Sequence, residues 1–317
     1  MYINNDIERV AFLGLCDLRG VGFETLKKAA IDRIPFRSFF NYEEGRNTAQ
    51  KEAIRVKYAR IFEHLSTNQK KETVLHSGQK KLESLHLMGI RVLFPGDGVY
   101  PERLMDLQDY PRWLFVQGNA LVLKHSAVTA VGSRKVSCEG SWLAAYFGYS
   151  IQEIGAVTVS GLAEGVDQII HRASLVANLP TVAVLGTGIL SNYPKGSEYL
   201  RKKIIEANGC IVTEYLPNDT FSARNFVRRN RIQAALGHVV FPVEWTLKSG
   251  TAHTVKFAKD LCRPMLYVRT PTQPKLDWIP SNLLSNSMRL TLPRDHDKFI
   301  SYLKDSLNPR LVQTRLF

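Results

Sequence analysis

Short apolar runs alternate with helical patterns through the middle of the chain. The apolar runs do not alternate with polar residues, as expected for strands buried on both faces of a parallel sheet. They cover residues 90–94, 114–116, 128–131, 156–160, 181–185, 210–213, 239–243 and 265–268. The helical patterns between them cover residues 140–154, 166–177, 198–207, 225–236 and 251–259. This alternation predicts an α/β fold with a doubly wound parallel sheet.

The two ends of the chain follow other patterns. Residues 1–85 read as helical, and residues 47–64 within them suit an amphipathic helix. After about residue 270 four prolines interrupt the pattern, and only residues 299–307 suit a last helix. At 317 residues the chain exceeds the usual size of one hydrophobic core. The sequence therefore predicts a helical domain at 1–85, a sheet domain at 86–270 and a C-terminal extension at 271–317.

The segment from Leu18 to Lys28 resembles a helix-hairpin-helix turn. In such a turn two glycines, here Gly20 and Gly22, expose backbone amides that can hold a DNA phosphate. The alternative is a plain glycine-containing turn between packed helices. Both interpretations stay open at this point.

Loops rich in glycine and serine follow several of the predicted strands. Ligands in this architecture bind at the carboxyl ends of the strands, and amides at helix N-termini bind anions. The candidate phosphate ligands in these loops are Gly132, Ser133, Arg134, Lys135, Ser160, Gly161, Ser249, Gly250 and Thr251. Ordinary turns are the competing interpretation, and a helix cap at Ser249 is compatible with a bound phosphate. The carboxylate of Glu164, in the loop after Gly161, would repel a phosphate.

A basic segment opens the helical pattern at 225–236. It contains Phe226, Arg228, Arg229, Asn230 and Arg231. Arginines beside an aromatic ring suit a groove for single-stranded nucleic acid, where phosphates pair with arginine and bases stack. The alternatives are a solvated basic face with the ring in the core, or arginines that organise neighbouring loops by binding backbone carbonyls.

Signatures of several enzyme classes are missing from the sequence. It contains no GxGxxG dinucleotide fingerprint, no GxxxxGK[ST] phosphate loop and no GxSxG nucleophile elbow. Asp167 and His171 are four residues apart, on one helix face, and we interpret them as a structural pair that fixes the loop. Four cysteines without a CxxC motif fit free thiols in a reducing cytosol. We expect no catalytic residue, no metal and no cofactor.

The charge balance favours a polyanionic partner. The chain has 42 Lys and Arg against 29 Asp and Glu, a net charge of +13. Such an excess is typical of proteins that bind nucleic acid. No apolar run is long enough to span a membrane, and the N-terminus lacks a signal-peptide pattern. We therefore expect a cytoplasmic protein with no membrane partner.

Taken in order, these loops resemble the DNA-processing protein A (DprA/Smf) family from about Pro95 to Val268. The shared motifs are Tyr100-Pro101-x-x-Leu104, Pro111-x-x-Leu114-Phe115-Val116-x-Gly118-Asn119, Val131-Gly132-Ser133-Arg134, Ser160-Gly161-Leu162-Ala163-x-Gly165-Val166-Asp167-x-x-x-His171, Ala183-Val184-Leu185-Gly186-x-Gly188, Tyr193-Pro194, Glu214-Tyr215, Phe226-x-x-Arg229-Asn230-Arg231-Ile232, and Val243-Glu244 followed by Ser249-Gly250-Thr251. A winged helix, common at the C-terminus of this family, has no clear counterpart.

The resemblance implies an extended Rossmann-like fold after a small SAM-like or helix-hairpin-helix domain. It implies binding of single-stranded DNA, self-association as a homodimer and delivery of the strand to a RecA-type recombinase in natural transformation, without catalysis. By the same resemblance Arg134 and Lys135, with the amides around Gly132 and Gly161, would hold phosphates. Arg229, Asn230 and Arg231 would line or brace the pocket.

Two other functions remain alternatives. A diverged relative can serve as a nucleotide- or DNA-sensing regulator in phage defence or a toxin–antitoxin system, with a toxin or effector as partner. A nucleotide phosphoribohydrolase of the LOG family has a similar fold and a PGGxGT loop. Only Ser249-Gly250-Thr251 and Glu244 loosely resemble that loop.

Overall fold

The chain forms two compact units. The computed structural model describes residues 3–41 and 48–307. One unit is Met1–Val92 and the other is Leu93–Phe317, so the boundary falls within strand β1 (Ile90–Leu93). The three-part division at residues 85 and 270 stays a prediction.

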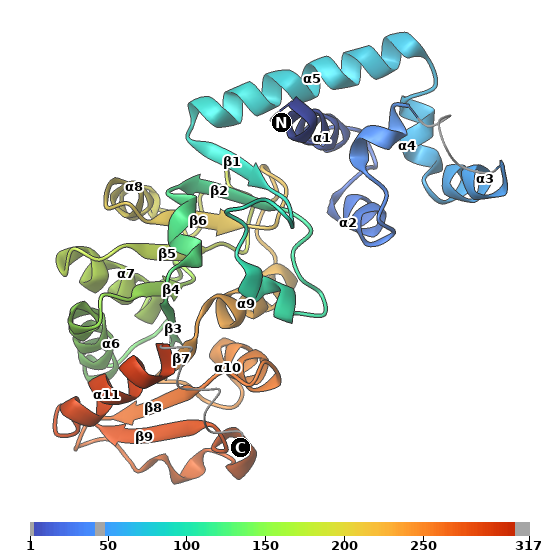
Figure 1. The fold of residues 1–317 in the computed structure, drawn as a ribbon. Helices are drawn as coiled ribbons and strands as arrows, with labels where there is room; N and C mark the ends of the chain where they lie inside the picture. The colour runs from blue at the N-terminus through green and yellow to red at the C-terminus, as the bar shows by residue number, and fades with distance from the viewer. Residues whose placement is uncertain (1–2, 42–47, 308–317) are drawn as a thin grey trace. The chain divides into compact units, whose positions relative to one another are not determined.

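The described part of the first unit is helical up to the start of β1 (Figure 1). Its helices are α1 (Ile3–Leu15), α2 (Phe23–Ile31), α3 (Thr48–Lys57), α4 (Ala59–His64) and α5 (Asn68–Leu87). Helices α1 and α5 pack closely because Gly14 and Gly78 stand at their contact. A Cβ on either glycine would overlap a backbone carbonyl of the other helix.

The prediction of one helix at 47–64 is wrong. In place of one helix at 47–64 there are two, because the chain leaves the helical conformation at the buried Tyr58. The hydroxyl of Tyr58 donates a hydrogen bond to Asp32. Residue 47 lies outside the described residues. The turn between α1 and α2 contains Gly20 at φ +80°, a conformation that favours glycine.

A mostly parallel sheet forms the second unit. Its strands are β2 (Leu114–Gly118), β3 (Ala127–Gly132), β4 (Val157–Ser160), β5 (Thr181–Val184), β6 (Cys210–Thr213), β7 (Val239–Val243), β8 (Met265–Arg269) and β9 (Ser287–Thr291). The strand order is β1-β2-β6-β5-β4-β3-β7-β8-β9. From β3 the sheet grows one way through β4, β5 and β6, and the other way through β7, β8 and β9. Only β2 is antiparallel among the pairs described, so the predicted doubly wound α/β fold is confirmed.

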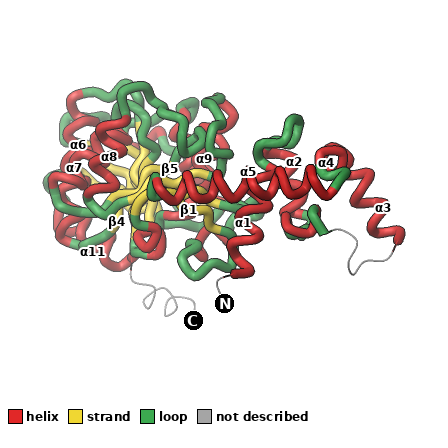
Figure 2. The backbone as a smooth tube through the Cα atoms, turned by 90° about the horizontal axis from the view of Figure 1, so that it is seen from above, coloured by secondary structure: helices red, strands yellow, loops and turns green. Residues whose placement is uncertain are grey.

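Helices cover both faces of this sheet. They are α6 (Cys138–Ser150), α7 (Val166–Val176), α8 (Glu198–Glu206), α9 (Ala223–Leu236), α10 (Gly250–Asp260) and α11 (His296–Leu307). Helices α6, α7, α8 and α11 lie on one face, and α9 and α10 on the other (Figure 1). Seen from above, the strands lie enclosed between helices (Figure 2). No helix of the described residues combines the length and the apolar character needed to cross a bilayer.

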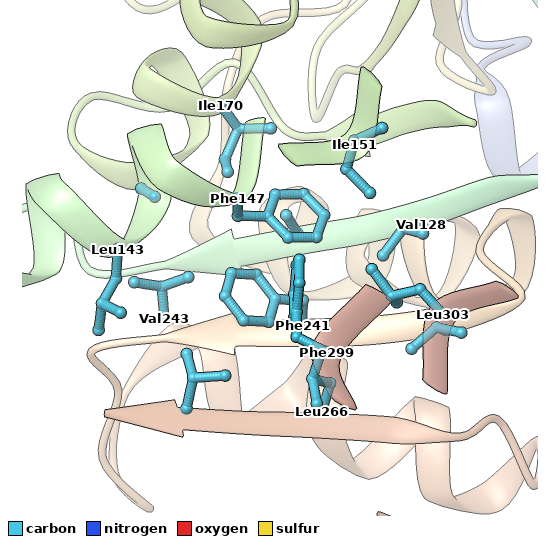
Figure 3. Close-up of a cluster of buried hydrophobic side chains, with 14 of the residues drawn as sticks. Val128, Leu143, Phe147, Ile151, Ile170, Phe241, Val243, Leu266, Phe299 and Leu303 are labelled. Carbon is cyan, nitrogen blue, oxygen red and sulfur yellow. The ribbon is translucent and has the colours of Figure 1, made fainter. Parts of the chain in front are cut away.

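Aromatic rings fill the core between the sheet and α6, α7 and α11. Phe147 of α6 stacks on Phe241 of β7 with ring centroids 4.4 Å apart. Phe299 of α11 meets Phe147 edge-on with ring centroids 6.2 Å apart. Figure 3 shows Phe147, Phe241 and Phe299 together in this core. Each of these rings is fully buried. Helix α11 therefore belongs to the core of this unit.

Strand β9 is the strand that the apolar pattern missed. It pairs in parallel with β8 from Ser287 to Thr291 at the edge of the sheet. Its first three residues are half-buried or exposed, and only Leu290 and Thr291 are buried. An edge strand with few buried apolar residues gives a weak sequence signal.

The packing of α11 predicts a large loss of stability for Phe299→Ala. Removing a buried ring leaves a cavity, and such substitutions cost about 3–5 kcal/mol in free energy of unfolding. Replacing the exposed Lys304 of the same helix by alanine should change stability by less than about 0.5 kcal/mol. Urea unfolding of both variants measures the difference. Equal stabilities would show that α11 does not stabilise this core.

Candidate functional site

A cavity of about 600 Å³ lies at the carboxyl ends of the central strands, and we call it the strand-end cavity. It lies at β3, which has β4 on one side and β7 on the other. The order of the strands reverses its direction at this point of the sheet. Doubly wound sheets bind ligands at such a point. The cavity brings together many of the predicted site residues, namely Gly132, Ser133, Arg134, Asp167, Phe226, Arg229, Asn230, Ser249, Gly250 and Thr251.

The other predicted residues do not line this cavity. They are Lys135, Ser160, Gly161, His171, Arg228 and Arg231. Lys135 is exposed beside Arg134. Ser160 is fully buried, and its hydroxyl donates to the carbonyl of Ala130 at 2.7 Å. Glu164 is exposed and is also absent from the cavity lining, so its carboxylate does not enter the cavity.

The turn after β3 presents an exposed guanidinium. Gly132 is needed there because a Cβ would overlap the carbonyl of Val243. The hydroxyl of Ser133 closes the turn by donating to the carbonyl of Lys135 at 2.6 Å. Arg134 is exposed, with its guanidinium carbon 5.4 Å from the ring centroid of Phe226. This cation stands at the edge of the cavity beside an aromatic ring.

Arg229 has a different position, inside the protein. It is 4% exposed, and Nη1 donates to the carbonyls of Gly161, at 2.8 Å, and Val184. Its guanidinium occupies the space where a side chain on Gly161 would lie. Burial lowers the pKa of Arg229 to about 10, against the opposing effect of the nearby carboxylate of Asp167. Arg229 therefore ties the loop after β4 to the carboxyl end of β5.

The two other arginines of the basic segment also have internal partners. Arg231 forms a two-pronged ion pair with the buried Glu214, at 2.8 and 2.7 Å. Its Nε donates to the carbonyl of Asp109 at 3.1 Å. Arg228 lies 3.3 Å from the carboxylate of Asp109 and 3.5 Å from that of Glu214. These contacts match the alternative in which the arginines organise neighbouring loops.

An aromatic cluster lies against the cavity. The rings of Tyr193 and Phe221 stack at 4.9 Å, and Tyr193 meets Phe226 at 5.1 Å. Phe221 is 60% exposed. Arg201 of α8 holds the loop that carries Tyr193 by donating to the carbonyls of Ser191 and Ile189, at 3.0 and 2.6 Å. The sequence motifs did not indicate Phe221 or assign Tyr193 to the site, because neither residue lies in the basic segment.

Two helix N-termini lie near the strand ends, and they differ in whether a side chain already binds their amides. At α6 the carboxylate of Glu244 accepts from the amide of Ser137 at 2.9 Å and from its hydroxyl at 3.0 Å. A negative charge already stands at that terminus. At α10 the N-cap Ser249 makes no side-chain cap bond, and Ser249, Gly250 and Thr251 line the cavity. The first amides of a helix have no intrahelical acceptor, so the start of α10 can receive an anion.

Asp167 and His171 have separate partners in the structure. His171 Nδ1 lies 2.8 Å from the hydroxyl of Thr181, and both residues are fully buried. Burial raises the pKa of Asp167, and the charge of Arg229 and the amides of Ala163 and Gly161 oppose that rise. His171 therefore contacts the first residue of β5, while Asp167 lies by the loop after β4. Among the described residues no cluster of His, Cys, Asp and Glu can hold a metal ion.

The buried His171 predicts a specific pH dependence of stability. Burial, aided by the charge of Arg229, lowers the pKa of His171 to about 3. An unfolded chain protonates histidine near pH 6.5, so the free energy of unfolding should fall as the pH drops from about 6.5 towards 3. His171→Gln should reduce the slope of the free energy of unfolding against pH by up to about 1.4 kcal/mol per pH unit between pH 4 and 6. Urea unfolding at several pH values tests this, and identical slopes for both proteins would contradict it.

Comparisons of the sequence with known proteins agree on one family. A model of the family described as DNA recombination-mediator protein A matches residues 91–291. Protein Smf of Escherichia coli K12 is 34% identical over 180 residues, covering 56% of this chain and 48% of that protein. DNA processing protein DprA of Streptococcus pneumoniae is 33% identical over 190 residues, covering 57% and 64% respectively. The chain thus matches about half to two thirds of the length of these relatives.

Solved structures show the same fold. The X-ray structure of DprA from Streptococcus pneumoniae superposes with a TM-score of 0.61 at 24% identity, covering 93% of this chain and 97% of that one. A structure of DNA processing protein A from Helicobacter pylori, described for its single-stranded DNA binding mode, gives 0.58 at 24% identity. It covers 68% of this chain and 96% of that one.

Proposed function

The chain belongs to the DNA recombination-mediator protein A family, and on that premise we propose that it binds single-stranded DNA at the strand-end cavity. The observation that carries the proposal is the combination of an exposed cation, an open helix N-terminus and an aromatic cluster around one cavity. The cation and the helix N-terminus can bind phosphates, and the aromatic cluster can stack with unpaired bases. The net charge of +13 attracts the strand over a longer range.

Phosphate binding rests on Arg134 and the start of α10. Arg134 is exposed, and its guanidinium presents several donors in one plane, which matches phosphate oxygens. The amides of Gly250 and Thr251 add donors aligned with the helix dipole. Lys135 adds a second exposed cation beside Arg134. In this proposal Arg229 and Arg231 act by bracing the loops, while Arg134 meets the strand.

Base binding rests on the aromatic cluster. Phe221 and Tyr193 present a stacked pair, and Phe226 lies between that pair and the guanidinium of Arg134. An aromatic ring next to a cation favours a stacked base whose phosphate pairs with the cation. Because bases in a duplex already stack on one another, this arrangement favours single strands.

The proposal includes no catalytic step. His171 is buried away from the cavity lining, and Asp167 is buried beside the guanidinium of Arg229. Transfer of the bound strand to a RecA-type recombinase follows from the family's role as a recombination mediator. Self-association as a homodimer also belongs to the proposal. Both are proposals about the whole protein.

The site predicts a strong salt dependence and a specific effect of Arg134→Ala. A single-stranded DNA binder releases about 0.7 counterion per phosphate contact, so affinity falls steeply with salt. Arg134→Ala should weaken binding about three- to tenfold and reduce the salt slope by about 0.7. The exposed Arg172 of α7 provides a control with the same charge change, and Arg172→Ala should keep the wild-type slope. Fluorescence anisotropy at several salt concentrations tests both, and an unchanged slope for Arg134→Ala would remove Arg134 from the site.

The aromatic cluster predicts a salt-independent effect of Phe226→Leu. Stacking of a base on a ring contributes about 1–3 kcal/mol, so the variant should bind at least about fivefold more weakly with an unaltered salt slope. Phe226→Tyr keeps the ring face and should retain most of the affinity. The same titrations measure both variants. Full affinity of Phe226→Leu would contradict a stacking role for this ring.

A further inference from the structure

A second cavity of about 600 Å³ lies between α7 and α8, and we call it the α7–α8 groove. The two helices cover the face of the sheet opposite α9 and α10 (Figure 1). The walls of the groove include Arg172 and Val176 of α7, and Tyr199 and Lys203 of α8. None of its lining residues also lines the strand-end cavity. The groove is therefore separate from the contacts proposed for DNA.

The packing of α7 differs on its two sides. Towards α6 the packing is close, because Gly148 of α6 lies where a Cβ would overlap the side chain of Ala173. Towards α8, Val176 is 66% exposed and Tyr199 is 70% exposed, and both line the groove beside the buried Leu200. Exposed apolar surface with a polar rim is typical of a site for another protein.

One cation of the groove has no acidic partner. Glu206, the acid of the groove, is already paired with Lys203 at 2.8 Å and with Lys202 at 3.7 Å. The guanidinium of Arg172 donates to the side-chain oxygen of Gln168 at 3.3 Å, and no ion pair among the described residues includes it. The groove thus presents apolar surface beside a cation that is available to a carboxylate.

Charge complementarity favours an acidic protein segment as the occupant. The net charge of +13 attracts acidic proteins and disfavours a second copy of this chain. Glu206 would repel a continuous row of phosphates, whereas a helix can place a single carboxylate at Arg172 and apolar side chains beside it. From Gln168 to Val176, α7 advances by about 12 Å, which matches about two turns of a helix lying along it.

We propose that the α7–α8 groove binds an acidic amphipathic helix of a partner protein. The apolar face of that helix lies between Val176 and Tyr199, and one of its carboxylates pairs with Arg172. A helix in a groove is a recurrent mode of protein recognition. The inference goes beyond the proposed function, and it leaves the strand-end cavity open to DNA while the partner is bound.

A pair of peptides tests the chemistry of the occupant. The probe is a labelled peptide of about fifteen residues with leucines on one helical face and glutamates on the other. Its control carries lysine in place of every glutamate. Anisotropy titrations with the full chain should show at least about tenfold tighter binding of the glutamate peptide. Equal affinities, or no binding of the glutamate peptide, would overturn the inference.

Variants of the groove locate the bound peptide. Arg172→Ala removes the ion pair and should weaken binding of the glutamate peptide about three- to fivefold. Val176→Ser removes apolar surface and should weaken it about three- to tenfold. Both side chains are exposed, so the fold should tolerate the changes. The exposed Arg224 of α9 provides the control, and Arg224→Ala should keep the wild-type affinity within about twofold. Wild-type affinity of both groove variants would place the peptide elsewhere and overturn the inference.

Competition with oligo(dT) separates this inference from the proposed function. Saturating oligo(dT) should leave the affinity for the glutamate peptide unchanged within about twofold, because the two sites share no residue. Displacement of the peptide by oligo(dT) would assign the groove to the DNA strand and overturn the inference. A chain that binds the peptide and no DNA would instead overturn the proposed function alone.

Discussion

The guanidinium of Arg229 is the interaction on which the strand-end cavity depends. It binds the carbonyls of Gly161 and Val184 and so connects the loop after β4 with the end of the neighbouring strand β5. A buried cation is expensive without partners, and here the carbonyls and the nearby Asp167 compensate it. Gly161 makes the insertion possible because any larger residue would occupy the same space. Without this cation two carbonyls would lose their donor and the loops would lose their common anchor.

Burial separates the positive charges of the site into two groups. Arg229 and Arg231 are nearly inaccessible and hold carbonyls or the carboxylate of Glu214. Arg134 and Lys135 are exposed. The helix N-termini divide in the same way, because Glu244 already stands at the start of α6 while the start of α10 faces the cavity. The inner charges therefore maintain the shape of the cavity, and the outer ones are free to meet a ligand.

Much of the fold could be predicted from the sequence, because strands buried on both faces read as continuous apolar runs. The runs at 210–213 and 239–243 coincide with β6 and β7, and the other six differ by only a few residues at their ends. The edge strand β9 and the helix break at Tyr58 could not be predicted. The polar half of β9 hides its pairing, and the position of Tyr58 depends on its hydrogen bond to Asp32, far away in sequence.

The site was harder to predict, because charge and ring type say little about burial. The sequence does not show which of Arg228, Arg229 and Arg231 have partners inside the protein. Those partners come from residues as distant in sequence as Asp109 and Gly161. Tyr193 and Phe221 reach the cavity from loops that carry no basic residue pattern. The α7–α8 groove had no sequence signal, because only the structure shows that Val176 and Tyr199 line one cavity.

We propose that the strand-end cavity binds single-stranded DNA through both phosphate and base contacts. The most direct measurement is a binding titration that compares a single strand with a duplex of the same length at two salt concentrations. The single strand should bind more tightly, because only its bases can reach the aromatic cluster, and both should lose affinity markedly at the higher salt. Equal affinity for single strand and duplex, or affinity that does not change with salt, would contradict it.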